Sequence, residues 1–136
     1  MCGMAPVPPR VLLIMPDQWP RALLRAALRD AGYDALGAPT LRAGLRYRPV
    51  SPERGTVRLV LVDQAALVEN DSATLLERLR ARYADPGLVL LARATARATL
   101  TPGVAWRRVL RRPVAIAELV AAVQDLVPLA SALPQE

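Results

Sequence analysis

Residues 57–63, VRLVLVD, give the clearest indication of architecture in the sequence. The run is apolar and ends in a carboxylate, Asp63, and a run this short and apolar is typical of a strand buried on both faces. In an open parallel α/β sheet, sites are built where the strands end. The stretch therefore predicts a central strand and places the candidate functional site at Asp63.

Further strand-like and helix-like patterns alternate on both sides of this run. The other predicted strands are 11–15, the more polar 33–38, 88–92, and 106–110, which is flanked by arginines. The predicted helices are about 18–31, 40–47, 72–84 and 115–127, with loops at 49–55 and 64–71 and an ambiguous segment at 93–104. This alternation predicts an α/β fold, a three-layer α/β/α sandwich around a five-stranded parallel sheet with right-handed crossovers.

The length and composition predict one domain. The chain has 136 residues and is 53% hydrophobic, so it can bury a core. We expect a flexible lead at 1–9, a domain at 10–128 and a tail at 129–136. The lead lacks the pattern of a signal peptide, and no apolar run approaches the ~18 residues of a membrane span. A cytoplasmic protein without membrane contact is expected.

Residue usage excludes several classes of chemistry. All 18 basic residues are arginine, there is no histidine, and there is one cysteine. Histidine-based catalysis, lysine nucleophiles, thiolate metal sites and disulfide scaffolds are therefore excluded. No glycine-rich phosphate loop or nucleotide fingerprint is present, and the segment 16–20 lacks the Ser, Thr or Gly that a flavin phosphate loop needs. We expect a protein that is not an enzyme.

Three local matches, in the right order, resemble the receiver domain of bacterial two-component response regulators over about residues 10–127. Residues 10–33 look like the first strand and helix of that family, and 59–63 look like its third strand with the phospho-accepting Asp. Arg112-Pro113 and the following helix with Glu118 resemble its Lys-Pro signature and last helix. The resemblance implies a CheY-like, flavodoxin-like sheet in the order 2-1-3-4-5 and a cis bond at Pro113, and residues 99–103 suggest a short or irregular fourth helix.

The chemistry that this resemblance implies needs more groups than the chain supplies. In the family, paired carboxylates hold Mg²⁺, the Asp attacks phosphorus, and a Lys pairs with the phosphoryl group. Here the acidic pair falls at Met15 and Pro16, which leaves Asp17 one position late, either as a helix cap or as a weak metal ligand with Asp63. The Lys position falls at Arg112, whose forked guanidinium is not equivalent to an amine.

The family's switch positions also carry other residue types. The Thr or Ser position falls near Ala92, or at Arg93 or Thr95 in a shifted register, and the aromatic switch position falls at Val109. The residue after the candidate phosphoacceptor is Gln64. These replacements predict a degenerate, or pseudo, receiver.

We expect Asp63 in such a receiver to be a relic, or a carboxylate satisfied by Arg112 and nearby backbone amides. No cofactor is then needed, and Mg²⁺ would bind only if the Asp63 site were active. The predicted function is that of a stand-alone receiver-like module in two-component or phosphorelay signalling. It would dock without phosphorylation to a sensor kinase, a regulator or its own copy.

The region around the fifth strand is the predicted interaction surface. One interpretation is an Arg-rich binding or homodimer surface formed with the last helix by Trp106, Arg107, Arg108 and Arg111. The other interpretation is that these residues form only a solvated basic edge. One alternative function is an atypical phosphoacceptor phosphorylated on Asp63. A second is a basic nucleic-acid-binding accessory protein, suggested by the net charge of +6 but disfavoured by the spread of the arginines and the lack of a helix-turn-helix signature.

Overall fold

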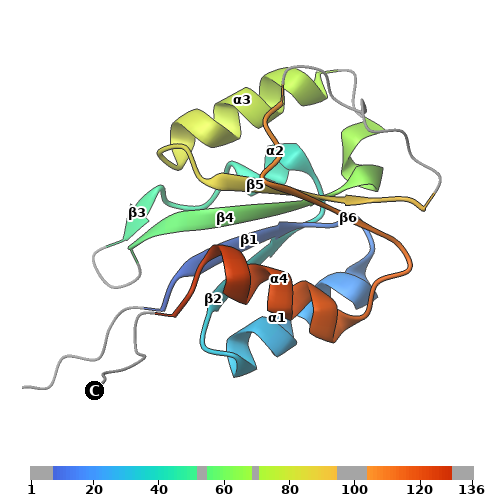
Figure 1. Cartoon of the computed structure of the whole chain (residues 1–136). Coiled ribbons are helices and arrows are strands. Elements are labelled where there is room, and N and C mark those ends of the chain that lie inside the picture. Colours follow the sequence, from blue (N-terminus) through green and yellow to red (C-terminus); the bar gives the residue numbers. More distant parts are fainter. Residues whose placement is uncertain (1–7, 52–54, 69–70, 95–103, 130–136) are drawn as a thin grey trace, which may run out of the picture.

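A parallel sheet forms the centre of the protein, in a computed structural model that describes residues 8–51, 55–68, 71–94 and 104–129. The strands are β1 (Arg10–Ile14), β2 (Asp34–Ala38), β3 (Val50–Ser51), β4 (Gly55–Asp63), β5 (Gly87–Ala92) and β6 (Arg108–Arg111). The parallel order is β2-β1-β4-β5-β6, and β3 pairs with β4 in the antiparallel sense (Figure 1). In chain order the five parallel strands run 2-1-3-4-5, so the predicted topology is confirmed.

Helices cover both faces of this sheet. They are α1 (Gln18–Asp30), α2 (Leu41–Gly44), the 3₁₀ helix η1 (Gln64–Val68), α3 (Ser72–Arg82) and α4 (Ile116–Leu126). Figure 1 shows α1 and α4 on one face and α2 and α3 on the other. The described residues therefore form the predicted three layers.

Each face of the sheet has its own apolar core because side chains alternate along the strands. In β1, Leu13 packs with Leu24 and Leu28 of α1, whereas Leu12 and Ile14 pack on the face of α2 and α3. All three β1 side chains are fully buried. Burying one such side chain contributes about 1.5–3 kcal/mol to the stability of the fold. The buried side chains of β1 therefore help to hold the sheet in which Asp63 lies.

Two predicted boundaries are wrong on the α2 and β3 side. The helix expected at 40–47 is a single turn, capped by the Thr40 hydroxyl, which accepts a hydrogen bond from the backbone N–H of Ala43 at 3.0 Å. Pro49 disfavours helical backbone at the preceding residue, and the chain turns instead into a β3–β4 hairpin within the expected loop 49–55. Gly55, the first residue of β4, has a φ of +74°, a conformation that glycine adopts readily.

Smaller corrections apply elsewhere. Residues 64–68 of the expected loop form η1, and the last strand begins at Arg108 instead of Trp106. The short or irregular fourth helix was expected within 93–104, and residues 95–103 lie outside the described residues. In the described part of the chain, no helix is long and apolar enough to cross a bilayer.

A buried arginine, Arg10, lies at the end of the sheet opposite Asp63. Arg10 is almost fully buried, and its Nη1 donates to the carbonyl oxygens of Arg48 and Gly55 at 3.0 and 3.1 Å. Its Nε lies 3.6 Å from an oxygen of Asp34. A buried charge is tolerated when it is paired and hydrogen-bonded, and here Arg10 also ties the β3–β4 hairpin to β1.

The edge strand β2 is covered by side chains from α1 and from the segment after α2. The carbonyl of Ala35 accepts from Arg25 Nε at 3.2 Å and from Arg29 Nη2 at 3.4 Å, and Gly37 O accepts from the Tyr47 hydroxyl at 2.5 Å. Exposed strand edges invite pairing with other chains. These side chains occupy the outward carbonyls of β2 and so disfavour such pairing.

Candidate functional site

Asp63 ends β4 at the carboxyl edge of the sheet, as predicted, and its side chain is only 6% exposed. Its Oδ1 accepts a hydrogen bond from the backbone N–H of Ala65 at 3.0 Å. Its Oδ2 accepts from Arg112 Nη2 at 2.6 Å. The expected contacts with Arg112 and with a backbone amide are therefore confirmed, and both carboxylate oxygens are engaged.

The backbone around β6 brings Arg112 to this carboxylate. The backbone N–H of Arg112 donates to the carbonyl of Ala92 at 2.9 Å, which extends the β5–β6 pairing past the last strand residue. The Arg112–Pro113 bond is cis, as the family resemblance implied. The Arg112 side chain is 39% exposed, so the guanidinium that contacts Asp63 stays partly open to solvent.

Gln64 adds a contact that the sequence did not reveal. Its Oε1 accepts a hydrogen bond from the backbone N–H of Arg93 at 2.7 Å and so links the ends of β4 and β5. Gln64 and Arg93 line a small hollow of about 140 Å³ together with Leu67 and Val68. The only sequence signal for this role was the position of Gln64 directly after Asp63.

Comparisons with solved structures bear on this arrangement of strand ends. The chain superposes on the Vibrio cholerae chemotaxis protein CheY4 with a TM-score of 0.71 and 17% identity, covering 89% of this chain and 100% of that one. A response regulator receiver protein from Pseudomonas putida gives 0.69 and 21%, with 89% and 99% covered. HP1043, an orphan response regulator of H. pylori, gives 0.66 and 16%, with 86% and 94% covered.

The chain has the CheY-like receiver fold. No protein-family model matches the sequence, and no curated protein matches it. Since the identities are low, the likeness shows the fold alone. The receiver positions in this chain must therefore be judged from its own side chains.

At the acidic-pair position of the receiver fold, this chain offers little to a cation. Met15 is buried in the core between the sheet and α1, and Pro16 is exposed without a ligand atom in its side chain. Asp17 occupies the N-cap position of α1, yet its side chain makes no capping hydrogen bond. Within the described ranges, no group of three or more His, Cys, Asp or Glu side chains could hold a metal ion.

The residues predicted to occupy the receiver switch positions have no hydroxyl or aromatic group within the described part of the chain. Ala92, at the Thr or Ser position, is buried and has no hydroxyl. Arg93 is exposed, and Thr95 lies outside the described residues. Val109, at the aromatic position, is 41% exposed on β6. The described residues thus provide no hydroxyl or aromatic ring at these positions that could respond to a phosphoryl group.

The structure divides the predicted Arg-rich surface. Trp106 is partly buried against the core on the α3 side, and Arg108 Nη2 donates to Asp125 of α4 at 2.7 Å. The side chain of Arg107 lies over Gly87, where an added Cβ would meet its Cδ at 2.7 Å. Trp106 is therefore anchored inward and Arg108 is neutralised, so the four residues do not form one continuous unpaired basic patch.

Proposed function

We propose that this chain is a receiver-like signalling domain that acts by protein–protein interaction without phosphoryl transfer to Asp63. The observation that carries the proposal is the engagement of both carboxylate oxygens, Oδ2 by Arg112 and Oδ1 by the Ala65 amide. Suitable partners are a sensor kinase, another regulator or a second copy of the chain.

A bridged aspartate is a poor nucleophile for phosphorus. An attack by Oδ2 must break its 2.6 Å contact with Arg112, and an attack by Oδ1 must compete with its hydrogen bond from the Ala65 N–H. Transfer also requires cationic stabilisation of the phosphoryl oxygens, which carboxylate-bound Mg²⁺ supplies elsewhere. Removing one preorganised electrostatic contact typically slows catalysis by about 10²–10³-fold. Because Met15 and Pro16 occupy the predicted acidic positions, we expect phosphoryl transfer to Asp63 to be slowed by this full factor.

The pairing of the arginines also argues against nucleic acid as the main partner. Phosphate binding needs a set of cations that are free to contact the backbone. In the 107–112 cluster, Arg108 is bonded to Asp125 and Arg112 to Asp63. This reduces the positive charge on the β6 edge that a nucleic acid could use.

The proposal is tested by titrating the ¹⁵N-labelled protein with Mg²⁺ and beryllofluoride, a mimic of a phosphorylated aspartate, while amide shifts are followed by NMR. We expect no saturable shifts around Asp63 at millimolar Mg²⁺. Any remaining spectral changes should be the same in wild type and in Asp63→Asn. Saturable shifts in wild type that vanish in Asp63→Asn would instead establish a phosphoacceptor. An Arg112→Lys variant tests whether the guanidinium itself blocks the site.

A further inference from the structure

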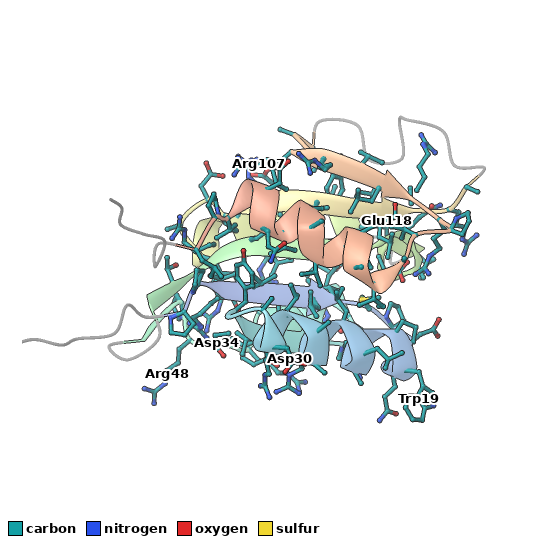
Figure 2. The ribbon with its side chains drawn as sticks, turned by 60° about the horizontal axis from the view of Figure 1, so that its bottom comes forward. Trp19, Asp30, Asp34, Arg48, Arg107 and Glu118 are labelled. Carbon is teal, nitrogen blue, oxygen red and sulfur yellow. The ribbon has the colours of Figure 1, made fainter. Side chains whose placement is uncertain are left out.

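Helix α1 has an outer apolar stripe in addition to the face that it buries against the sheet. Trp19 is 77% exposed and Leu23 is 55% exposed, and the small side chains of Ala22 and Ala26 are exposed beside them. These residues follow i, i+3, i+4, i+7 spacing, so they share one helix face. Figure 2 shows Trp19 projecting away from the ribbon at the beginning of α1.

This stripe differs from the other exposed apolar positions of the described residues. Val68 on η1 and Val109 on β6 are single exposed side chains on separate elements. Scattered single apolar residues are normal on protein surfaces, whereas a grouped set that includes an aromatic residue marks an interaction site. Only α1 presents two large exposed apolar side chains on one face within the described ranges.

A row of arginines borders the stripe on its β2 side. Arg21, Arg25 and Arg29 repeat every four residues along α1, and each donates to a backbone carbonyl: Met15 O at 2.6 Å for Arg21, and Ala35 O for the other two. A carbonyl orients a guanidinium without cancelling its charge. Among the described residues, none of the three is paired with a carboxylate, so the row remains cationic.

A shallow hollow joins the apolar stripe to this cationic row. It has a volume of about 340 Å³ and is lined by Ala22, Ala26, Arg25, Arg29 and Asp30. The alanines form an apolar floor, and the wall carries the two arginines and the single carboxylate of Asp30, so its net charge is positive. An apolar stripe with charge along one side fits a helix whose own apolar residues repeat at the same spacing and whose flanks are acidic.

We propose that the outer face of α1, formed by Trp19, Leu23 and the Arg25/Arg29 row, docks an acidic amphipathic helix of a protein partner. The inference rests on the proposed function, because it names the surface and the partner of a domain that acts by docking. A second copy of the chain fits poorly, since two such faces would bring their arginine rows towards each other. Neutralised Arg108 and inward-packed Trp106 make the β6 edge the weaker candidate.

The test uses a synthetic helical peptide with Leu at i, i+3, i+4, i+7 and Glu at its flanks. Two matched peptides serve as controls: one has Lys in place of each Glu, and one has the same composition with the Leu positions scrambled. Amide and indole N–H shifts of the ¹⁵N-labelled full chain are followed by NMR. We expect saturable shifts along α1 and at the Trp19 indole, an unchanged Trp106 indole, and affinity that falls with added salt.

Two pairs of variants make the test specific to this face. Leu23→Ser should weaken binding at least about tenfold, while Val109→Ser, a change at another exposed apolar side chain, on β6, should leave it unchanged. Arg25→Gln should weaken binding about threefold or more, while Arg58→Gln on the exposed side of β4 should have little effect. Circular dichroism confirms that each variant is folded, which is expected because the side chains are exposed.

The possible results separate this inference from the proposed function. Three results would each overturn the α1 surface: equal binding of the Lys or scrambled peptide, shifts centred outside α1, or no shifts with the Glu peptide. Vesicles with anionic headgroups that produce the same Trp19 shift would assign the face to a lipid surface and overturn it as well. Saturable beryllofluoride binding at Asp63 would overturn the proposed function, while the peptide series would still decide the α1 surface.

Discussion

Replacing Arg112 by Met should destabilise the protein by about 2 kcal/mol. Breaking a fully buried ion pair costs about 3–5 kcal/mol because it leaves an unpaired charge, and an exposed pair contributes about 0–1 kcal/mol. Asp63 is 6% exposed and Arg112 is 39% exposed, so the pair lies between these limits. The Met side chain retains the aliphatic stem of Arg112, and the Ala65 amide still donates to the carboxylate. Urea unfolding at neutral pH measures the loss.

A control and a double-mutant cycle show whether the cost comes from this contact. Arg108→Met breaks the pair between Arg108 of β6 and Asp125 of α4, which has a similar 2.7 Å contact but lies at the surface. This change should cost about 0.5 kcal/mol or less. Asp63→Asn combined with Arg112→Met should reveal a coupling energy of about 1–2 kcal/mol. If Arg112→Met were no more destabilising than Arg108→Met, or if the coupling were zero, the Asp63–Arg112 contact would not hold the site.

Three further changes test other contacts. Burial raises the pKa of Tyr33 above its usual 10.0. The contribution of Tyr33 to stability is therefore full below pH 10 and is lost as pH rises through the higher folded-state pKa. The difference in unfolding free energy between wild type and Tyr33→Phe should shrink across that pH range. Glu118→Ala removes the carboxylate that accepts from the Ala115 N–H at 3.1 Å and should cost about 0.5–1 kcal/mol in urea unfolding. Gly87→Ala brings a Cβ to 3.0 Å from buried Leu59 and should lower the thermal midpoint through a cost of about 1–3 kcal/mol.

The sheet was predictable because its strands carry their own signal. Residues 11–14 and 59–62 are apolar at every position, and the structure buries both runs completely. A strand buried on both faces needs no alternation, so length and composition alone identify it. The bridge between Asp63 and Arg112 was expected from the receiver resemblance, which places Arg112 at the family's Lys position, and the parallel sheet brings the carboxyl ends of both strands to one edge.

The positions that sequence could not predict depend on contacts between distant residues. Nothing in the local pattern shows that Arg25 and Arg29 cover the β2 edge, since their partner is a backbone carbonyl of Ala35. The β3–β4 hairpin was hidden by a segment rich in Pro, Ser and Gly, which is typical of a loop. Trp19 falls within the helix predicted at 18–31, and the structure adds that it is 77% exposed, whereas Leu24 and Leu28 of the same helix are buried.

The expected coupling of about 1–2 kcal/mol between Asp63 and Arg112 has a direct consequence for regulation. By itself it favours the bridged arrangement by about 5- to 30-fold over one in which the carboxylate is free. Metal-assisted phosphorylation would be needed to reverse such a bias. The sequence predicts only one further carboxylate near Asp63 for that metal, Asp17, which is exposed at the start of α1. If α1 docks a partner as proposed, that binding does not depend on Asp63, and the concentration and charge of the partner control it. That makes the salt dependence of binding at α1, and not the state of Asp63, the quantity that distinguishes this domain from a phosphorylation switch.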